Sequence, residues 1–387
     1  GGTNGKGTTS FKLSEVLKLN GIRTGLFVSP HLASFRERIQ VDSELLPEES
    51  FVNNFQTLMK LCSDNKISAT EFELTFLMAA LHFKQSNCEA VVLEVGLGGE
   101  YDATNVVNAA LSIICSVSLD HTRILGSTVE AIAQNKAGIF KRNQPALVGP
   151  GVPLSVTQDK ATERGAHFYT YDCAYQQLRP KLWKHNIDLS AGDSEHGVTF
   201  SPMVDTDALN ANIALLGLHL LQKHHPGAFP QLDLLSERTA LGLDARPPCR
   251  WEEHIYRVPE PQKDSSNSTA TAVHAAGPYD ATETRFQAEE MHRKKAAATE
   301  EADHAREVEV VLDMGHNPAA MAALSRRIAF KYPDRDVRII YAMSRDKDVR
   351  TCLKNVLSIV PPSHIHFVQS KNWRAVSREE LSALFRE

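Results

Sequence analysis

The sequence begins with Gly1 and the stretch Gly2-Thr3-Asn4-Gly5-Lys6-Gly7-Thr8-Thr9-Ser10, which decides the class of fold. Glycines allow backbone N–H groups to gather around phosphate oxygens, and a lysine can reach the outer phosphates of a nucleotide. Residues 11–19 have the pattern of an amphipathic helix, whose N-terminus would add a partial positive charge. The stretch therefore predicts a phosphate-binding loop that opens a helix. A glycine turn before an ordinary capped helix is the alternative.

The spacing of this loop departs from the Walker A motif. Two residues separate its first glycines where Walker A has four, and Gly7 stands between Lys6 and Thr8. A phosphate loop normally follows a buried strand, whereas here only Gly1 precedes it. We therefore expect a fragment that lacks its natural N-terminus, so that no targeting segment can be interpreted.

Length and composition indicate a globular chain with two domains. The sequence has 387 residues, of which 42% are hydrophobic and 23% charged, and its net charge is −5. This charge gives no support to nucleic-acid binding, and no apolar run approaches the roughly 20 residues that span a bilayer. The six cysteines are scattered, which argues against a zinc site or a disulfide framework and fits a reducing compartment.

Strands and helices alternate in the first 150 residues. Buried strands are expected at 24–28, 88–95, 111–117 and 146–148, a further strand at 39–42, and helices near 47–62, 70–81 and 127–141. The alternation predicts an α/β domain with a parallel sheet. In such sheets, ligands bind beyond the carboxyl ends of the strands.

Three polar residues stand at or just past expected strand ends: Ser29, Glu94 and His121. Together they could hold one magnesium ion, which prefers oxygen ligands, beside bound phosphates. Each has an ordinary alternative, namely a turn cap for Ser29, an arginine partner for Glu94 and a hydrogen-bonded core position for His121. Because all three belong to one sheet, we favour the metal site. Lys136, on the following helix, would by physical reasoning alone be a surface charge.

The pattern is less regular beyond residue 150. Residues 172–203 read as short β-hairpins and residues 207–223 as a helix. From 260 to 306 the composition becomes linker-like, charged and alanine-rich, which we interpret as a disordered or partly helical insertion. A second α/β unit follows, with strands expected at 308–313, 337–341 and 364–368. Its small size and uncapped last helix indicate a truncated C-terminus.

A series of short motifs runs through the chain: GTNGKGT (2–8), SPHL (29–32), RERI (36–39), EVGLGG (94–99), DATN (102–105), DHT (120–122), LG (125–126), KAGIFK (136–141), DMGHNP (313–318) and DKD (346–348). Together they resemble the folylpolyglutamate synthase/dihydrofolate synthase family of Mur-ligase-like ATP-dependent amide ligases. The resemblance implies an ATP-binding P-loop domain of the Mur ligase central type at 1–252, a linker with a disordered insertion at 253–306, and a smaller Rossmann-like glutamate-ligase domain at 307–387.

The resemblance also implies a role for each matched residue. ATP would be bound by Thr3, Asn4, Gly5, Lys6, Gly7, Thr8, Asn210, Arg250 and Asp313, with the register of Asn210 left open by its neighbour Asn212. Magnesium would be held by Ser29, Glu94 and His121, and Lys136 matches a lysine that becomes carbamylated and helps to hold a second magnesium ion. A potassium ion is left open. Catalysis would involve Lys6, His121, Lys136 and His316, and the pterin-bearing substrate would meet Phe72, Glu73 and Asp102.

The implied reaction is ATP-dependent addition of L-glutamate to dihydropteroate, to the γ-carboxylate of folates, or to both, through an acyl phosphate. Two alternatives stay open: a folylpolyglutamate synthase only, and an inactive nucleotide-binding homologue. Expected partners are these small molecules, without nucleic acid or membrane, and the chain is expected to be monomeric. The cytoplasm is the expected compartment, with a mitochondrial form left open.

Three positions depart from the family pattern. Glu100 stands where arginine or lysine is usual, Asn135 where glutamate is frequent, and Met314-Gly315 where Gly-Ala is usual. The first change would alter a charged contact near the substrate, and the others are mild.

Overall fold

The computed structural model describes residues 1–184, 206–259, 305–371 and 374–386. Its α-helices are α1 (Lys6–Leu19), α2 (Glu48–Asn65), α3 (Glu71–Gln85), α4 (Thr122–Leu125), α5 (Val129–Ala137), α6 (Leu154–Arg164), α7 (Tyr171–Lys184), α8 (Thr206–His224), α9 (Glu237–Asp244), α11 (Pro318–Lys331), α12 (Val349–Leu357) and α13 (Arg378–Arg386). Its strands are β1 (Thr24–Phe27), β2 (Ile39–Val41), β3 (Glu44–Leu45), β4 (Ala90–Leu93), β5 (Ser112–Ile114), β6 (Pro145–Val148), β7 (His167–Thr170), β8 (Arg250–Pro259), β9 (Ala305–Asp313), β10 (Ile339–Tyr341) and β11 (Ile365–Phe367).

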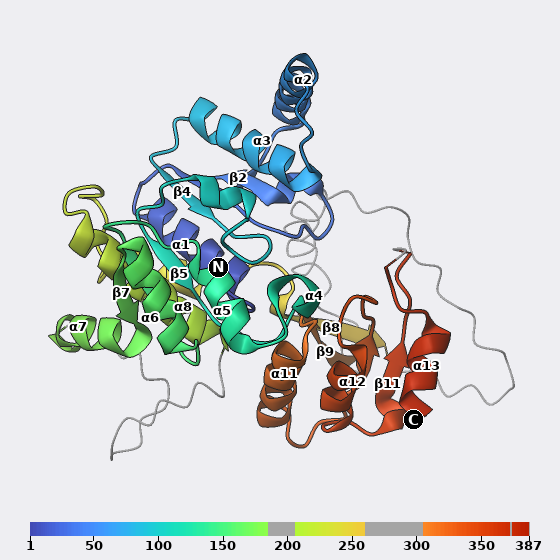
Figure 1. Ribbon diagram of the computed structural model, residues 1–387. Helices are drawn as coiled ribbons and strands as arrows, with labels where there is room; N and C mark the ends of the chain where they lie inside the picture. Colours follow the sequence, from blue (N-terminus) through green and yellow to red (C-terminus); the bar gives the residue numbers. More distant parts are fainter. Residues whose placement is uncertain (185–205, 260–304, 372–373, 387) are drawn as a thin grey trace, which may run out of the picture.

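Two sheets form the larger unit, drawn from blue to yellow in Figure 1. One has the order β3-β2-β1-β4, with β1 parallel to β4, and the other has the order β5-β6-β7 with all pairs parallel. The predicted α/β class with parallel strands is therefore confirmed. Strand β4 is shorter than expected and lies at a sheet edge, where Val91 is 45% exposed.

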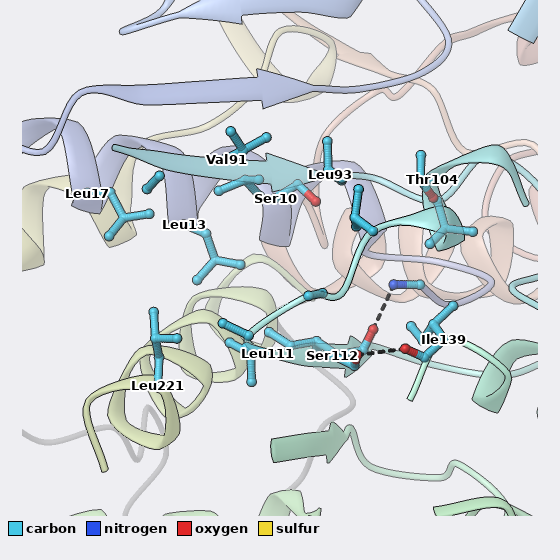
Figure 2. Close-up of a pocket in the computed structure, with 18 of the residues that line it drawn as sticks. Ser10, Leu13, Leu17, Val91, Leu93, Thr104, Leu111, Ser112, Ile139 and Leu221 are labelled. Atoms are coloured by element: carbon cyan, nitrogen blue, oxygen red, sulfur yellow. Dashed lines mark hydrogen bonds between the residues drawn. The ribbon is translucent and has the colours of Figure 1, made fainter. Parts of the chain in front are cut away.

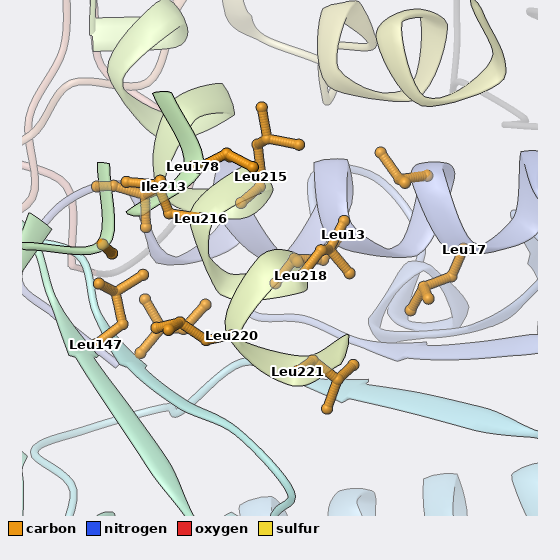
Figure 3. Close-up of a cluster of buried hydrophobic side chains, with 14 of the residues drawn as sticks. Leu13, Leu17, Leu147, Leu178, Ile213, Leu215, Leu216, Leu218, Leu220 and Leu221 are labelled. Carbon is orange, nitrogen blue, oxygen red and sulfur yellow. The ribbon is translucent and has the colours of Figure 1, made fainter. Parts of the chain in front are cut away.

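Helix α8 lies at the centre of the core of this unit. Figure 3 shows its leucines facing Leu13 and Leu17 of α1 on one side and Leu147 of β6 on the other. The run 213–221 is buried around its whole circumference, as expected for a helix covered by other elements on several sides. This packing fixes α1, and with it the glycine-rich loop, against the strands.

The smaller unit, drawn in orange and red in Figure 1, has a second α/β arrangement of strands and helices. Strands β10 and β11 are parallel, and their core includes Tyr341, Cys352 and Leu353. Strands β8 and β9 form an antiparallel ribbon between the two units. The expected linker at 253–306 therefore differs at both ends, because residues 253–259 and 305–306 pair as strands. Residues 260–304 lie outside the described residues.

The expected β-hairpins at 172–203 are wrong over the described part, since α7 continues to Lys184. Tyr171, Ala174 and Leu178 are all buried, at the spacing of one helix face. The helix expected at 127–141 ends at Ala137, where Gly138 is its C-terminal cap. Among the described helices none is both long and apolar enough to cross a membrane.

A buried lysine that the sequence pattern did not reveal joins three helices. Lys12 of α1 has no exposed side-chain surface, and its Nζ lies 3.1 Å from Asp207 Oδ1 of α8. The same ammonium donates to the carbonyl oxygens of Leu243 and Ala245 at the end of α9, at 2.6 and 2.9 Å. A buried charge is tolerated when it is paired and hydrogen-bonded in this way.

We expect Lys12→Met to lower the free energy of unfolding by about 3 kcal/mol, because it leaves two buried carbonyls without their donor and removes the buried one of the two cations that pair with Asp207, the other being Arg246. Urea denaturation followed by circular dichroism measures the change. Lys60→Met is the matched control, since Lys60 pairs with Asp64 on an exposed face of α2 and should cost at most about 0.5 kcal/mol. Equal effects of the two substitutions would contradict the role of Lys12.

Candidate active site

A cavity of about 610 Å³ lies between the two units. The structure brings to it most of the residues that the sequence predicted for the site: Thr3, Asn4, Gly5, Lys6, Gly7, Thr8, Ser29, Glu94, His121, Lys136, Asn210, Arg250, Asp313 and His316. They come from segments that follow strands, from the first turn of α1, from helices α5 and α8, and from the β8–β9 ribbon and the turn after it. Residues of both units thus line the cavity.

The glycine-rich loop is fixed on the end of β5. The amide N–H groups of Thr3 and Asn4 donate to the carbonyl and hydroxyl oxygens of Ser116, at 2.7 and 2.9 Å. Gly5 has φ +84°, which favours glycine, and a side chain there would collide with Asn210. Helix α1 begins at once with Lys6, so the free N–H groups of its first turn lie at the cavity. This geometry is suited to binding a phosphate group.

Glu94, just past β4, is a buried carboxylate at the base of the loop. It is 5% exposed, and its Oε2 accepts from Ser29 N at 3.0 Å. Gly7 leaves room for it, since an added Cβ would lie 3.3 Å from that oxygen. Burial raises the pKa of Glu94, against the opposing effect of Lys6. A carboxylate desolvated in this way is stabilised as an anion by a nearby cation.

His121 and Lys136 line the same cavity. His121 caps α4 with φ +50°, and burial, followed by the charge of Lys347, lowers its pKa, so its imidazole is neutral near pH 7. Lys136 is 5% exposed, and its Nζ donates to Gly2 O at 2.9 Å. Burial, with a further contribution from Lys6, lowers the pKa of Lys136 to about 7. The expectation of a surface charge at Lys136 is therefore wrong, because α5 turns this side chain inward.

The β8–β9 ribbon supplies the far wall. Arg250 is opposite Asp313 in the ladder, which shifts register between Arg250 and Glu252. Asp313 accepts from Trp251 N at 3.0 Å and Gly315 N at 2.7 Å, so its carboxylate orders the turn that follows β9. His316, in that turn, donates from Nδ1 to Met314 O at 3.0 Å, which leaves its Nε2 as an acceptor. Burial lowers the pKa of His316.

Three predicted substrate residues do not line this cavity. Phe72 packs against Phe27 with ring centroids 5.6 Å apart. Glu73 forms a capping box with Thr70 at the start of α3. Asp102 accepts from the N–H groups of Gly96 and Leu97, both at 3.0 Å. Glu73 and Asp102 thus have local structural partners in this arrangement.

The structure adds polar contacts between the two units that sequence reasoning missed. Asn4 of the loop and Asn317 at the start of α11 exchange amide hydrogen bonds of 3.3 and 2.8 Å. Asp120 lies 3.4 Å from Lys347 Nζ, with only 14% and 11% of the two side chains exposed. Burial alone would raise the pKa of Asp120, but Lys347 and His121 hold it below its ordinary value. The motifs that contain these residues can be recognised in the sequence. Which of the residues contact one another depends on the fold.

We expect Lys347→Met to weaken the docking of the two units by about 2 kcal/mol, because it leaves Asp120 without its cation. Small-angle scattering should then show a larger radius of gyration. Since the pKa of Asp120 is lowered in the docked state, the wild-type contact is stabilising above its ordinary pKa of about 4 and is lost as pH falls through the lowered value. Arg345→Met is the control, because its partner Glu380 belongs to the same unit. An unchanged radius for Lys347→Met would contradict the prediction.

The departures from the family pattern can be placed. Glu100 pairs with Arg164 at 2.7 Å and with Lys160 at 3.4 Å, both on α6. It does not line the cavity. Asn135 lies beside Lys136 and packs against Gly98, and its Oδ1 is buried without a hydrogen-bond partner. The amide avoids the charge that glutamate would bury at this position.

Comparison with known proteins gives a consistent result. A family model described as Mur ligase middle domain matches residues 1–222. The dihydrofolate synthase/folylpolyglutamate synthase of Escherichia coli is 44% identical over 220 residues, which are 56% of this chain and 50% of that protein. The protein of the same name from Haemophilus influenzae is 46% identical over 158 residues, 40% of this chain and 35% of that protein. The chain thus spans a third to a half of the length of these relatives.

Solved structures extend the likeness to the whole chain. A structure described as E. coli FolC in complex with ADP, without folate substrate, has a TM-score of 0.69 and 27% identity, and the match covers 100% of this chain and 78% of that one. A bifunctional folylpolyglutamate synthase/dihydrofolate synthase with Mn, AMPPNP and L-glutamate bound has a TM-score of 0.69 and 28% identity, with 99% and 77% covered.

Proposed function

The chain belongs to the Mur ligase middle-domain family, and from this premise we propose that it is an ATP-dependent amide ligase that adds L-glutamate to a pterin-bearing carboxylate. The acceptors would be dihydropteroate, the γ-carboxylate of folates, or both. The similar proteins named for these activities support the proposal. A folylpolyglutamate synthase only, and an inactive nucleotide-binding homologue, are the alternatives.

The observation that carries the proposal is the single cavity shared by Lys6, Glu94, His121 and Lys136 with Asp313 of the ribbon. A carboxylate does not condense with an amine in water, because hydroxide is a poor leaving group. ATP can convert the carboxylate into an acyl phosphate, which the amine of glutamate then attacks with loss of phosphate. Such a reaction needs a phosphate cradle, positive charge beside it, and protection from water, and this cavity has features suited to each.

The loop residues would hold the phosphates of ATP. N–H groups of residues 5–8 and the Lys6 ammonium would face the β- and γ-phosphates, with Thr8 at the helix start. Asn210 is the member of its pair that packs on Gly5, which supports the register proposed for it. Arg250 and Asp313 would meet ATP from the ribbon, and His316 would lie near the transferred phosphate.

The donor set fits a divalent metal ion. Glu94 is buried beside the loop, His121 is neutral, and Ser29 offers a hydroxyl, which together suit magnesium or manganese. In the described residues, no three His, Cys, Asp or Glu side chains cluster closely enough to hold a metal. A carbamylated Lys136 would supply a further carboxylate for a second ion. A bound ion of this kind neutralises charge on the phosphoryl group.

Two domains are proposed, 1–252 and 307–387, joined by the β8–β9 ribbon. Residues of both line the cavity, so docking of the second domain would exclude water from an acyl phosphate. We still propose that the pterin contacts Phe72, Glu73 and Asp102. Because these residues do not line the cavity, the pterin would lie outside it.

Glutamate-dependent release of ADP tests the function. Dihydropteroate and tetrahydrofolate would be supplied separately, each with and without L-glutamate. Release with both acceptors supports the bifunctional enzyme, and release with tetrahydrofolate alone supports the narrower alternative. Nucleotide binding without release with either acceptor would refute the ligase proposal.

A further inference from the structure

The proposed reaction assigns no role to the motif at residues 36–39, although this motif belongs to the loop that carries Ser29. The loop joins β1 to β2, and its two ends are paired, because Val28 N donates to Arg38 O at 3.0 Å. Ser29 lines the cavity of the candidate active site. The way in which the loop is held therefore bears on the position of Ser29.

Ser29 and Glu94 follow the parallel neighbours β1 and β4. On its other side β4, which carries Val91 and Leu93, borders a cavity of about 630 Å³ that is lined mostly by apolar side chains (Figure 2). Glu94 is held from the β1 side, where its N donates to Phe27 O at 2.8 Å and its Oε2 accepts from Ser29 N at 3.0 Å. The paired strands thus fix Glu94, whereas Ser29 already belongs to the loop.

Glu37 holds this loop through its carboxylate. Its Oε2 accepts from the N–H of Leu32 at 2.7 Å, and its Oε1 accepts from the N–H groups of Ala33 and Ser34 at 2.9 and 2.6 Å. Burial raises the pKa of Glu37, but these three N–H groups outweigh that effect and hold it below its ordinary value. A carboxylate offers only acceptors to the three donors, whereas the NH₂ group of a glutamine would oppose one of them.

Arg38 holds the same loop at its next residue. Its Nε donates to His31 Nδ1 at 2.9 Å, so each of the residues 31–34 is bonded to Glu37 or Arg38. Leu32 is 44% exposed, and water could therefore satisfy its N–H in another loop conformation. The contact with Glu37 thus selects one conformation of the loop and contributes little to overall stability.

We propose that Glu37 is a positioning residue, whose carboxylate fixes the loop after β1 so that the Ser29 hydroxyl is held at the cavity as a ligand for a divalent metal ion. This inference rests on the metal role proposed for Ser29. Without the carboxylate, the loop would populate several conformations, and the hydroxyl would be in place for only part of the time. Because Glu37 acts through Ser29, its loss should matter little once that hydroxyl is absent.

The test measures the affinity of the full chain for Mn²⁺ in the presence of AMPPNP, by electron paramagnetic resonance of the free ion. Glu37→Gln and Ser29→Ala are each expected to weaken Mn²⁺ binding about ten-fold, the effect typical for loss of a group that orients a metal ligand. The double variant should be no weaker than Ser29→Ala, because changes that act through one group are not additive. Hydrogen exchange of the amides of residues 32–34 should be about ten-fold faster in Glu37→Gln.

Glu48→Gln is the matched control. Glu48 pairs with Arg36 of the same motif at 3.3 Å, and its side chain is 82% exposed. The substitution removes one acidic charge beside the loop without touching the hydrogen bonds of Glu37. It should leave both the Mn²⁺ affinity and the amide exchange unchanged, and equal effects of the two substitutions would contradict the role of Glu37.

Three further results would overturn the proposal. Unchanged amide exchange in Glu37→Gln would show that the carboxylate does not hold the loop. Unchanged Mn²⁺ affinity in Glu37→Gln, or additive losses in the double variant, would show that it does not act through Ser29. Unchanged affinity in Ser29→Ala would remove Ser29 from the metal site, and with it a premise of the proposed function. None of these readouts requires turnover, so failure of this inference is distinguishable from failure of the ligase proposal.

Discussion

Lys6→Met is expected to lower the rate of glutamate-dependent ADP release by about 10²- to 10³-fold, the size of effect typical for loss of one preorganised group that stabilises charge in a transition state. Lys6 is the first residue of α1, and its Nζ donates to Thr3 O at 3.1 Å at the wall of the cavity. Charge on a transferred phosphoryl group spreads over its outer oxygens, which this ammonium is placed to meet. Methionine keeps most of the aliphatic stem and removes the charge.

The same substitution has a second expected result. Lys6 contributes to the lowered pKa of Lys136, after burial, so Lys6→Met should move the pKa of Lys136 back upward. Lys60→Met, on the exposed face of α2, is the activity control, and an unchanged urea midpoint would show that Lys6→Met is folded. Full activity in folded Lys6→Met would refute the role of the loop in phosphate binding.

Lys136→Ala is expected to lower turnover at least about 10²-fold, and acetate or formate should restore part of it. The alanine leaves space beside Gly2 for a small carboxylate that replaces the carbamate. Lys6→Met should gain nothing from acetate, since it lacks a cation rather than a carboxylate. Wild-type turnover in Lys136→Ala would refute the proposed role, and failure of rescue would argue against carbamylation.

Carbamylation of Lys136 can also be observed without turnover. Carbon dioxide reacts with a neutral amine, and burial lowers the pKa of Lys136 to about 7. A carbamate signal from ¹³C-bicarbonate should therefore be seen by NMR near pH 8, weaken below about pH 7, and be absent in Lys136→Met. Between pH 7 and the ordinary lysine pKa the unfolded chain binds a proton that the folded chain does not, so folding stability should rise with pH in this range. Lys136→Met should flatten that rise.

The sequence predicted the fold class because apolar runs alternate with helical patterns through the first 150 residues. The runs are longer than the strands, since β4 covers only Ala90–Leu93. The resemblance to the ligase family was equally direct and is confirmed. Helix α7 was missed although Tyr171, Ala174 and Leu178 have helical spacing, because its intervening polar residues suggested alternation. Strand β8 was partly assigned to a linker, since its pairing partner β9 follows only after residue 304.

The site was predictable in its residue types and less so in its contacts. Ser29 and Glu94 follow the parallel neighbours β1 and β4, whose carboxyl ends meet at one sheet edge. The expectation that His121 belongs to the same sheet is wrong, because it follows β5 of the other sheet. The inward direction of Lys136 depends on how α5 packs, and the Asp120–Lys347 pair joins positions 227 residues apart. In the sequence Lys12 has the pattern of a surface residue of a helix. It is buried because α8 and the end of α9 pack over it. Burial of a side chain by elements that are distant in sequence cannot be inferred from the local pattern of residues.

The β8–β9 ribbon also determines where the chain can change in length. Its ladder runs from the Arg250–Asp313 pair at the cavity to the Pro259–Ala305 pair at the other end, a distance of roughly 30 Å for a strand of this length. The ends of the segment 260–304 are therefore held side by side, whatever number of residues joins them. The paired strands lie between this segment's ends and the residues Arg250 and Asp313 at the cavity. Replacement of residues 260–304 by a two-residue turn is therefore expected to leave the Arg250–Asp313 pair in register.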